Sequence, residues 1–159
     1  MRTAVVAAAL GALALAAGAQ PASAKTCRPN IVFEQSPSDT YLPGSPVRSV
    51  SGHGHVISGV VRSRTTCRAI AHAKLEFFHA GPDGNYSDGI TSWAGRATVF
   101  TRADGSFRFE SRYPSNSTGV LPHIHFRISA PGFRPAAATY FTHADKPAAT
   151  LALMLTPLR

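Results

Sequence analysis

The chain has 159 residues, a formal net charge of +8 at neutral pH and two cysteines. We expect this length to form one domain, and a domain of this size needs no structural metal in order to fold. The positive charge is compatible with nucleic acid, an anionic surface or an acidic small substrate. Because the arginines are scattered along the predicted strands without interleaved aromatic residues, we expect no nucleic-acid partner.

The first 24 residues have the features of a secretory signal peptide. Arg2 precedes an apolar run from Ala4 to Ala17, and Ala22-Ser23-Ala24 has the small residues of a cleavage site. The run is too short and too rich in alanine for a membrane span, so we expect no integral membrane segment. The sequence therefore predicts cleavage after Ala24 and a protein that is secreted or periplasmic.

Export changes the chemistry expected of Cys27 and Cys67, because a disulfide persists outside the reducing cytosol. We expect the two to pair. The bond would close a loop of about 40 residues and stabilise the fold by roughly 4 kcal/mol in the chain-entropy model. A cysteine-ligated metal is disfavoured, since neither cysteine has a second Cys or His two to four residues away.

Residues 25–52 are rich in Pro, Ser and Gly and lack periodicity, which predicts an extended N-terminal arm before a domain over residues 53–159. The segment Gly52-His53-Gly54-His55 enters the first regular strand. Its two histidines could bind a metal, but the adjacent glycines would hold them poorly. We therefore expect a solvated loop there.

Seven short segments rich in β-branched or aromatic residues follow, each bounded by Gly, Pro, Asn or Asp. With no long helical pattern, they predict an all-β fold, a β-sandwich of about seven or more strands. The predicted strands cover residues 56–61, 73–79, 96–101, 106–110, 124–130, 137–142 and 149–155.

The stretch "VFTRADGSFRFE" is the clearest candidate for a β-hairpin. Ala103-Asp104-Gly105 would form its turn, with Gly105 able to adopt a positive φ. Phe107 and Phe109 would face one side of the second strand, and the polar residues between them the other.

The stretch "VLPHIHFRISAPGF" alternates polar and apolar residues. In a strand, His123 and His125 share one face with Arg127, while Ile124 and Phe126 share the other. Two histidines on one strand face, roughly 6.6 Å apart at Cα, can reach one metal ion. The same pattern also fits a strand whose polar face simply contacts water.

Two of the four tyrosines are expected at strand ends, where binding sites are commonly built. Tyr86 lies in the turn-forming stretch "GPDGNYSDG", and Tyr113 in "ESRYPSNS", where Pro114 stops the preceding strand. Tyr140 lies within a predicted strand and Tyr41 lies in the N-terminal arm, so we expect both to be packing or surface residues.

Taken in order, the segments "CRAIAHAKLEFFHAGPDGNY", "GRATVFTRADGSFRFESRYP", "PHIHFRISAPGF" and "TYF" resemble the intradiol ring-cleavage dioxygenases, and in particular their short, secreted, single-domain members. The resemblance covers about residues 52–142. It implies a non-haem Fe(III) site with four protein ligands, Tyr86, Tyr113, His123 and His125. Tyr113 and His125 would be axial, and the other two equatorial beside a hydroxide.

The chemistry of these four ligands suits ferric iron. Phenolate oxygens are hard anionic donors, and two of them with one hydroxide cancel the three positive charges of ferric iron, which lowers the cost of burying the site. The cation would also favour the ionised form of a tyrosine whose pKa is ordinarily about 10.

The resemblance implies a reaction in which a catechol displaces the hydroxide and Tyr113, and O₂ cleaves the ring between the two hydroxylated carbons. The partners would be a catecholic small molecule and O₂. Arg96 is a candidate to face the site, although arginines more often serve solvation. Ile90 and Trp93, which follow Tyr86, are candidates to line the substrate pocket.

One departure from the family pattern concerns catalysis. Many members carry an arginine three residues before the first histidine, and Val120 stands there in this chain. Two alternatives to the enzyme therefore stay open: a non-catalytic module of the same fold that binds a metal or another ligand, and a plain secreted β-domain. Nothing in the sequence indicates an oligomeric state.

Overall fold

The computed structural model describes residues 27–34, 39–86, 93–117, 119–143 and 145–159. This part of the chain folds into eight β-strands without a helix, which confirms the predicted all-β class. Among these residues there is accordingly no helix long and apolar enough to cross a membrane. The predicted signal peptide lies outside the described residues.

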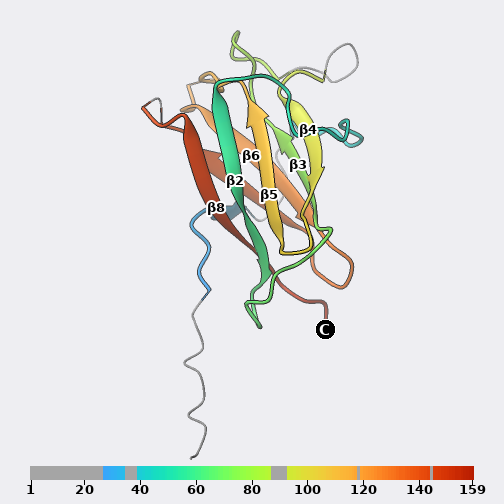
Figure 1. The fold of residues 1–159 in the computed structure, drawn as a ribbon. Coiled ribbons are helices and arrows are strands. Elements are labelled where there is room, and N and C mark those ends of the chain that lie inside the picture. Colours follow the sequence, from blue (N-terminus) through green and yellow to red (C-terminus); the bar gives the residue numbers. More distant parts are fainter. Residues whose placement is uncertain (1–26, 35–38, 87–92, 118, 144) are drawn as a thin grey trace, which may run out of the picture.

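The strands form two facing sheets (Figure 1). One sheet has five strands in the order β1-β7-β6-β3-β4, and the other has three in the order β5-β2-β8. The bounds of the strands are β1 Val32–Glu34, β2 His55–Ser63, β3 Lys74–Phe78, β4 Arg96–Phe100, β5 Ser106–Ser111, β6 His123–Ser129, β7 Ala136–Phe141 and β8 Ala148–Leu155.

All pairs of neighbouring strands run antiparallel except β2 and β8, which pair in parallel over eight residue pairs from Val56↔Ala148 to Ser63↔Leu155. Every strand expected from the alternation of residues is present within two residues of its predicted ends. Strand β1, which pairs with β7 at the edge of the five-stranded sheet, was not predicted from the sequence.

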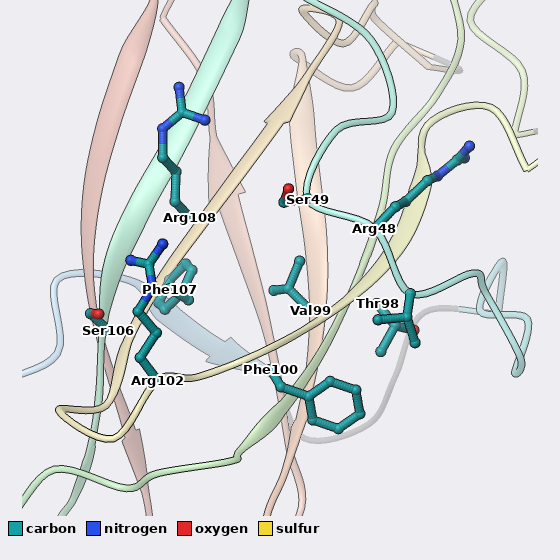
Figure 2. Close-up of a pocket in the computed structure, with 10 residues that line it drawn as sticks. Arg48, Ser49, Thr98, Val99, Phe100, Arg102, Ser106, Phe107 and Arg108 are labelled. Atoms are coloured by element: carbon teal, nitrogen blue, oxygen red, sulfur yellow. The ribbon is translucent and has the colours of Figure 1, made fainter.

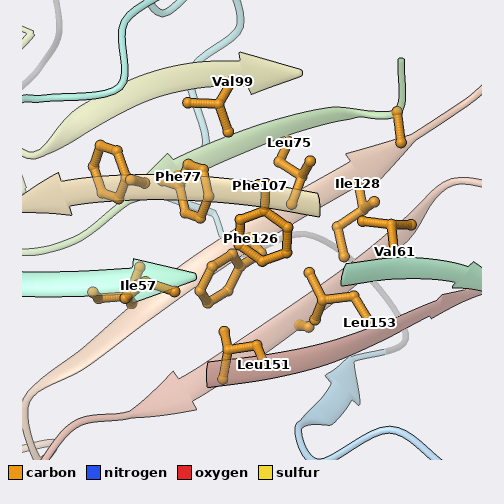
Figure 3. Packing of buried hydrophobic residues seen from close by; sticks show 14 of the residues in the cluster. Ile57, Val61, Leu75, Phe77, Val99, Phe107, Phe126, Ile128, Leu151 and Leu153 are labelled. Carbon is orange, nitrogen blue, oxygen red and sulfur yellow. The ribbon is translucent and has the colours of Figure 1, made fainter. Parts of the chain in front are cut away.

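The hydrophobic core fills the space between the sheets, because each strand turns alternate residues inward. In β2, every second side chain from His55 to Ser63 is buried and those between are partly exposed. Figure 3 shows side chains from both sheets meeting in this layer, among them Ile57, Phe126 and Leu153. Phe77 is at its centre, with its ring 4.4 Å from that of Phe109 and 4.9 Å from that of Phe126, measured between centroids.

The predicted hairpin between β4 and β5 is wrong in its pairing. The turn forms, with Gly105 at φ +75° and its amide donating to the carbonyl of Arg102, and Phe107 and Phe109 face the core as expected. However, β4 belongs to the five-stranded sheet and β5 pairs with β2 in the other. The carbonyl of Gly105 accepts from the amide of Val61 in β2, so the turn is tied to the opposite sheet and carries the chain across the core.

The N-terminal segment is fastened to the domain at several points. Cys27 and Cys67 form the predicted disulfide, with their Cα atoms 5.6 Å apart. Further along, Tyr41 donates to Glu76 through its hydroxyl at 3.1 Å, and the carbonyl of Thr40 accepts from Arg96 at 2.9 Å. Residues 39–50 therefore cover part of the outer face of the five-stranded sheet, which is the face that carries the candidate site.

Candidate metal centre

His123 and His125 lie in β6 on the outer face of the five-stranded sheet, opposite the core face that carries Ile124 and Phe126. The predicted alternation is therefore present. The alternative of a water-facing polar strand does not describe His123, whose exposed fraction is only 6%. His125 is partly buried, in the middle of the sheet, between Phe78 of β3 and Thr139 of β7.

Three of the four predicted ligands meet in one group. The Tyr86 hydroxyl lies 2.9 Å from Nε2 of His123, and this nitrogen lies 3.1 Å from Nε2 of His125. The two imidazole rings are nearly perpendicular, with centroids 4.7 Å apart. Two nitrogens bound at right angles to a metal, each at roughly 2.1 Å, would be about 3.0 Å apart, so the spacing fits a shared ion.

The opposite nitrogens of the two rings are held by hydrogen bonds. Nδ1 of His123 donates to the carbonyl of Leu121 at 2.6 Å, and Nδ1 of His125 bonds the Thr139 hydroxyl at 2.9 Å. Because a carbonyl only accepts, a neutral His123 carries its proton on Nδ1 and leaves a lone pair on Nε2. That lone pair faces both Tyr86 and His125, and a cation would satisfy all three donor atoms together.

The remaining predicted ligand, Tyr113, follows β5 and contacts a different set of rings. Its ring is edge-on to His55 at 5.4 Å between centroids, and His55 in turn stacks on Tyr140 at 6.2 Å. Burial raises the pKa of Tyr140, and the neighbouring Tyr113 adds to the effect. The hydrogen-bonded group in the described residues thus contains Tyr86, His123 and His125, and Tyr113 lies beside His55.

His55 corrects the expectation of a solvated loop. It is the first residue of β2 and has no exposed surface, because it points inward where the two sheets end. Burial lowers its pKa, partly offset by backbone groups at Lys146 and Pro147, and within the described residues neither ring nitrogen has a well-formed hydrogen bond. His53, two residues earlier, is exposed and pairs with Glu110 at 3.0 Å.

His79, which the sequence analysis did not single out, is also buried at this end of the sandwich. Its Nδ1 donates to the carbonyl of Ala80 at 2.8 Å, and its Nε2 is buried without a hydrogen-bond partner in the described part of the chain. Burial lowers its pKa, with smaller contributions from His55, Arg96 and His123. A cavity of about 70 Å³ is lined by His79 together with Ser51 and Tyr113.

Arg96 lies in β4, almost fully buried on the same outer face. Its guanidinium lies 5.5 Å from the ring centroid of Phe78, the ring that stacks on His125 at 4.9 Å. It also donates to the carbonyl of Thr40, so at least part of its role is to hold residues 39–50 on the sheet. Whether Arg96 acts on a substrate stays a prediction.

Of the two residues predicted to line a substrate pocket, Trp93 belongs to the described part of the chain. Ile90 lies outside the described residues. Trp93 is partly buried, and its carbonyl accepts hydrogen bonds from the guanidinium of Arg48 and the amide of Arg96.

A separate groove of about 290 Å³ lies away from these histidines, beside β4 and β5 (Figure 2). Two of its three arginines already have partners: Arg48 bonds the carbonyls of Trp93 and Arg96, and Arg108 pairs with Glu110 at 3.4 Å. None of the tyrosines and histidines predicted as metal ligands lines this groove, so it is not the candidate site.

Within the described residues, no three His, Cys, Asp or Glu side chains cluster closely enough to hold a metal ion. A metal centre in this part of the chain would therefore need phenol oxygens in addition to the imidazoles. The group formed by Tyr86, His123 and His125 supplies this mixed donor set, which suits a hard trivalent cation.

Comparison with known proteins identifies the fold. No family model matches the sequence. A curated relative, chlorocatechol 1,2-dioxygenase of Pseudomonas putida, is 27% identical over 135 residues, and the match covers 67% of this chain and 52% of the relative. The chain thus spans about half the length of the curated relative that it matches.

Solved structures agree. The dioxygenase domain of a carbohydrate-binding fusion protein from Streptomyces sp. SirexAA-E superposes with a TM-score of 0.61 and 24% identity over 73% of this chain and 90% of that one. An intradiol ring-cleavage dioxygenase from Tetranychus urticae superposes with a TM-score of 0.69 and 18% identity over 82% and 95%. The predicted resemblance to the intradiol ring-cleavage dioxygenases is therefore confirmed, and the sandwich is the fold of that family.

Proposed function

We propose that this protein is an exported non-haem Fe(III) dioxygenase that cleaves catecholic rings between their two hydroxylated carbons with O₂. The curated relative is a chlorocatechol 1,2-dioxygenase, which supports ring cleavage in general. The single observation that carries the proposal for this chain is the meeting of Tyr86 Oη, His123 Nε2 and His125 Nε2 within 2.9 and 3.1 Å on this fold.

Four side chains would hold the iron: Tyr86, His123 and His125, which already meet, and Tyr113 as the fourth ligand that the family resemblance implies. When bound, ferric iron supplies a Lewis acid that draws electron density from a catecholate and so activates it toward O₂. The neutral imidazoles add no charge, and the two phenolates with one hydroxide balance the cation.

The chain itself prepares the donor atoms. The Leu121 carbonyl keeps the His123 proton on Nδ1 and leaves Nε2 free to bind. The Tyr86 proton, which faces Nε2 of His123, must leave the phenol for this oxygen to become an anionic ligand. Phe78 lies against one face of His125, and Phe141 contacts His123, so apolar surface lies beside both imidazoles.

We also propose that the protein is exported from the cytoplasm. Export is supported by the features of residues 1–24 and by the Cys27–Cys67 disulfide, since such bonds persist in oxidising compartments. A catecholic compound met outside the cytoplasm would suit this location.

The decisive experiment is a visible spectrum of the protein loaded with ferric iron, recorded before and after catechol is added, together with oxygen uptake. We expect a red-brown protein whose band shifts with catechol and which consumes O₂. His125→Ala should lose the colour, while the exposed His72→Ala should keep it. A wild-type protein that stays colourless and binds no iron would refute the proposal.

A second candidate, a non-catalytic metal-binding module of the same fold, is favoured by one observation. Tyr113 contacts His55 and not the hydrogen-bonded group of the other three predicted ligands. Coloured protein that takes up no oxygen with any catechol would support this module over the enzyme.

A further inference from the structure

We propose that Thr139 is a positioning residue that fixes which edge of the His125 ring faces the candidate metal centre. The inference rests on the proposed function, because it concerns a side chain that would bind the iron. Its evidence is separate, since it comes from the contacts around His125 alone.

The contact joins neighbouring strands. His125 of β6 is directly opposite Thr139 of β7, and the Thr139 hydroxyl lies 2.9 Å from Nδ1 of His125. Thr139 is largely buried, so water competes poorly for this bond. The bond points Nδ1 toward β7 and leaves Nε2 directed at His123, 3.1 Å away.

The stacking of Phe78 on the His125 ring cannot fix which edge faces the site. Phe78 stacks on the face of His125, with the planes 21° apart. Stacking fixes the plane of an imidazole, but a ring rotated by 180° about its Cβ–Cγ bond stacks equally well. In the rotated ring, carbon atoms would replace the two nitrogens, so the hydrogen bond between Thr139 and Nδ1 favours the orientation in which Nε2 faces His123.

His123 is held differently. Its Nδ1 donates to the backbone carbonyl of Leu121, so no side-chain substitution removes the acceptor for this nitrogen. The Nδ1 contact of His125, unlike that of His123, can therefore be removed by a single side-chain substitution. A hydroxyl suits the position because it can either accept from or donate to Nδ1.

Thr139→Val tests the inference, because valine keeps the shape of threonine and removes the hydroxyl. Thr139→Ser restores the hydroxyl, and Thr98→Val is a matched control on the same face of the same sheet, where a buried threonine bonds Ser45 at 2.9 Å. All variants are first compared with wild type by circular dichroism to confirm folding.

The first readout is nuclear magnetic resonance of metal-free protein labelled in its histidine rings. We expect one His125 ring orientation in wild type, Thr139→Ser and Thr98→Val, and two exchanging orientations in Thr139→Val. The second readout is ferric-iron affinity, measured from the tyrosinate absorption band. We expect Thr139→Val to bind iron roughly 10- to 100-fold more weakly, as when other hydrogen-bond partners of metal ligands are removed.

The outcomes separate the two proposals. An unchanged His125 orientation in Thr139→Val overturns the positioning role, whatever the affinity. Changed orientation with unchanged iron affinity also overturns it, since the orientation would then not matter for binding. If wild type binds no iron, the proposed function fails, and so does the role of Thr139 toward a metal.

Discussion

Phe77 and Phe109 come from different sheets, and their rings stack almost parallel at 4.4 Å between centroids. Phe77 extends from β3 of the five-stranded sheet, and Phe109 from β5 of the three-stranded sheet. Both are almost completely buried. Their contact is therefore one of the main attachments between the two layers of the sandwich.

Replacing Phe109 by alanine should lower the free energy of unfolding by about 3–5 kcal/mol, because the substitution removes a buried aromatic ring and leaves a cavity. Urea denaturation followed by circular dichroism measures the effect. Phe100→Ala is the control, since 47% of Phe100 is exposed, and should cost far less. Equal losses in the two variants would contradict the central place of Phe109.

Thr101 should contribute to stability through its buried hydroxyl. The hydroxyl donates to the carbonyl of Ile70 at 2.7 Å and accepts from the amide of Ala73 at 2.8 Å. Thr101→Val would leave both backbone groups unsatisfied and should cost about 1–3 kcal/mol. Thr101→Ser keeps both bonds and should retain most of the stability in the same urea experiment. A valine variant as stable as wild type would show that these bonds are dispensable.

His79 should make the metal-free protein less stable in weak acid. Burial lowers its pKa from the ordinary value of 6.5, so the unfolded chain binds a proton that the folded protein resists. The free energy of unfolding should be unaffected by this group above about pH 7 and fall as the pH drops below 6.5.

His79→Gln should remove this part of the pH dependence. Between pH 7.5 and pH 5.5, wild type should lose about 1 kcal/mol more than the variant, measured by urea denaturation. His72→Gln, at an exposed position, should behave as wild type. The same pH dependence in wild type and His79→Gln would assign the effect to other groups.

The Cys27–Cys67 disulfide should stabilise the fold through the loop that it closes. Replacing both cysteines by serine should lower the free energy of unfolding by roughly 2–4 kcal/mol. The loss should be accompanied by faster proteolysis of residues 27–34, because the bond anchors the segment that precedes β1. Unchanged melting temperature and protease resistance would show that β1 pairing alone holds this segment.

The alternation of residues predicted seven strands because each places one row of side chains in the core. It could not predict their partners. The turn at Gly105 is encoded locally, but its neighbour is Val61 of β2, more than forty positions earlier. Strand β1 was missed because three residues carry too little periodicity.

The candidate site was predictable in part for the same reason. His123 and His125 follow from the alternation within β6, and Tyr86 and Tyr113 from turn residues and from the family resemblance. The burial of His55 was not predictable, because the glycines around it suggested a loop and its neighbours Tyr113 and Tyr140 are far from it in the sequence. The assignment of all four ligands remains a prediction.

The parallel pairing of β2 and β8 has a consequence for how the chain folds. Ser58 and Ala149, joined through the Ser58 hydroxyl, are 91 positions apart, and no local turn brings such strands together. The chain must lose the entropy of closing this long loop before the strands can pair and stabilise each other. Proteins rich in such long-range contacts therefore fold slowly. We expect the three-stranded sheet to form late in folding. Strands β2 and β5 would pair first and stay exposed, and β8 would pair with β2 last.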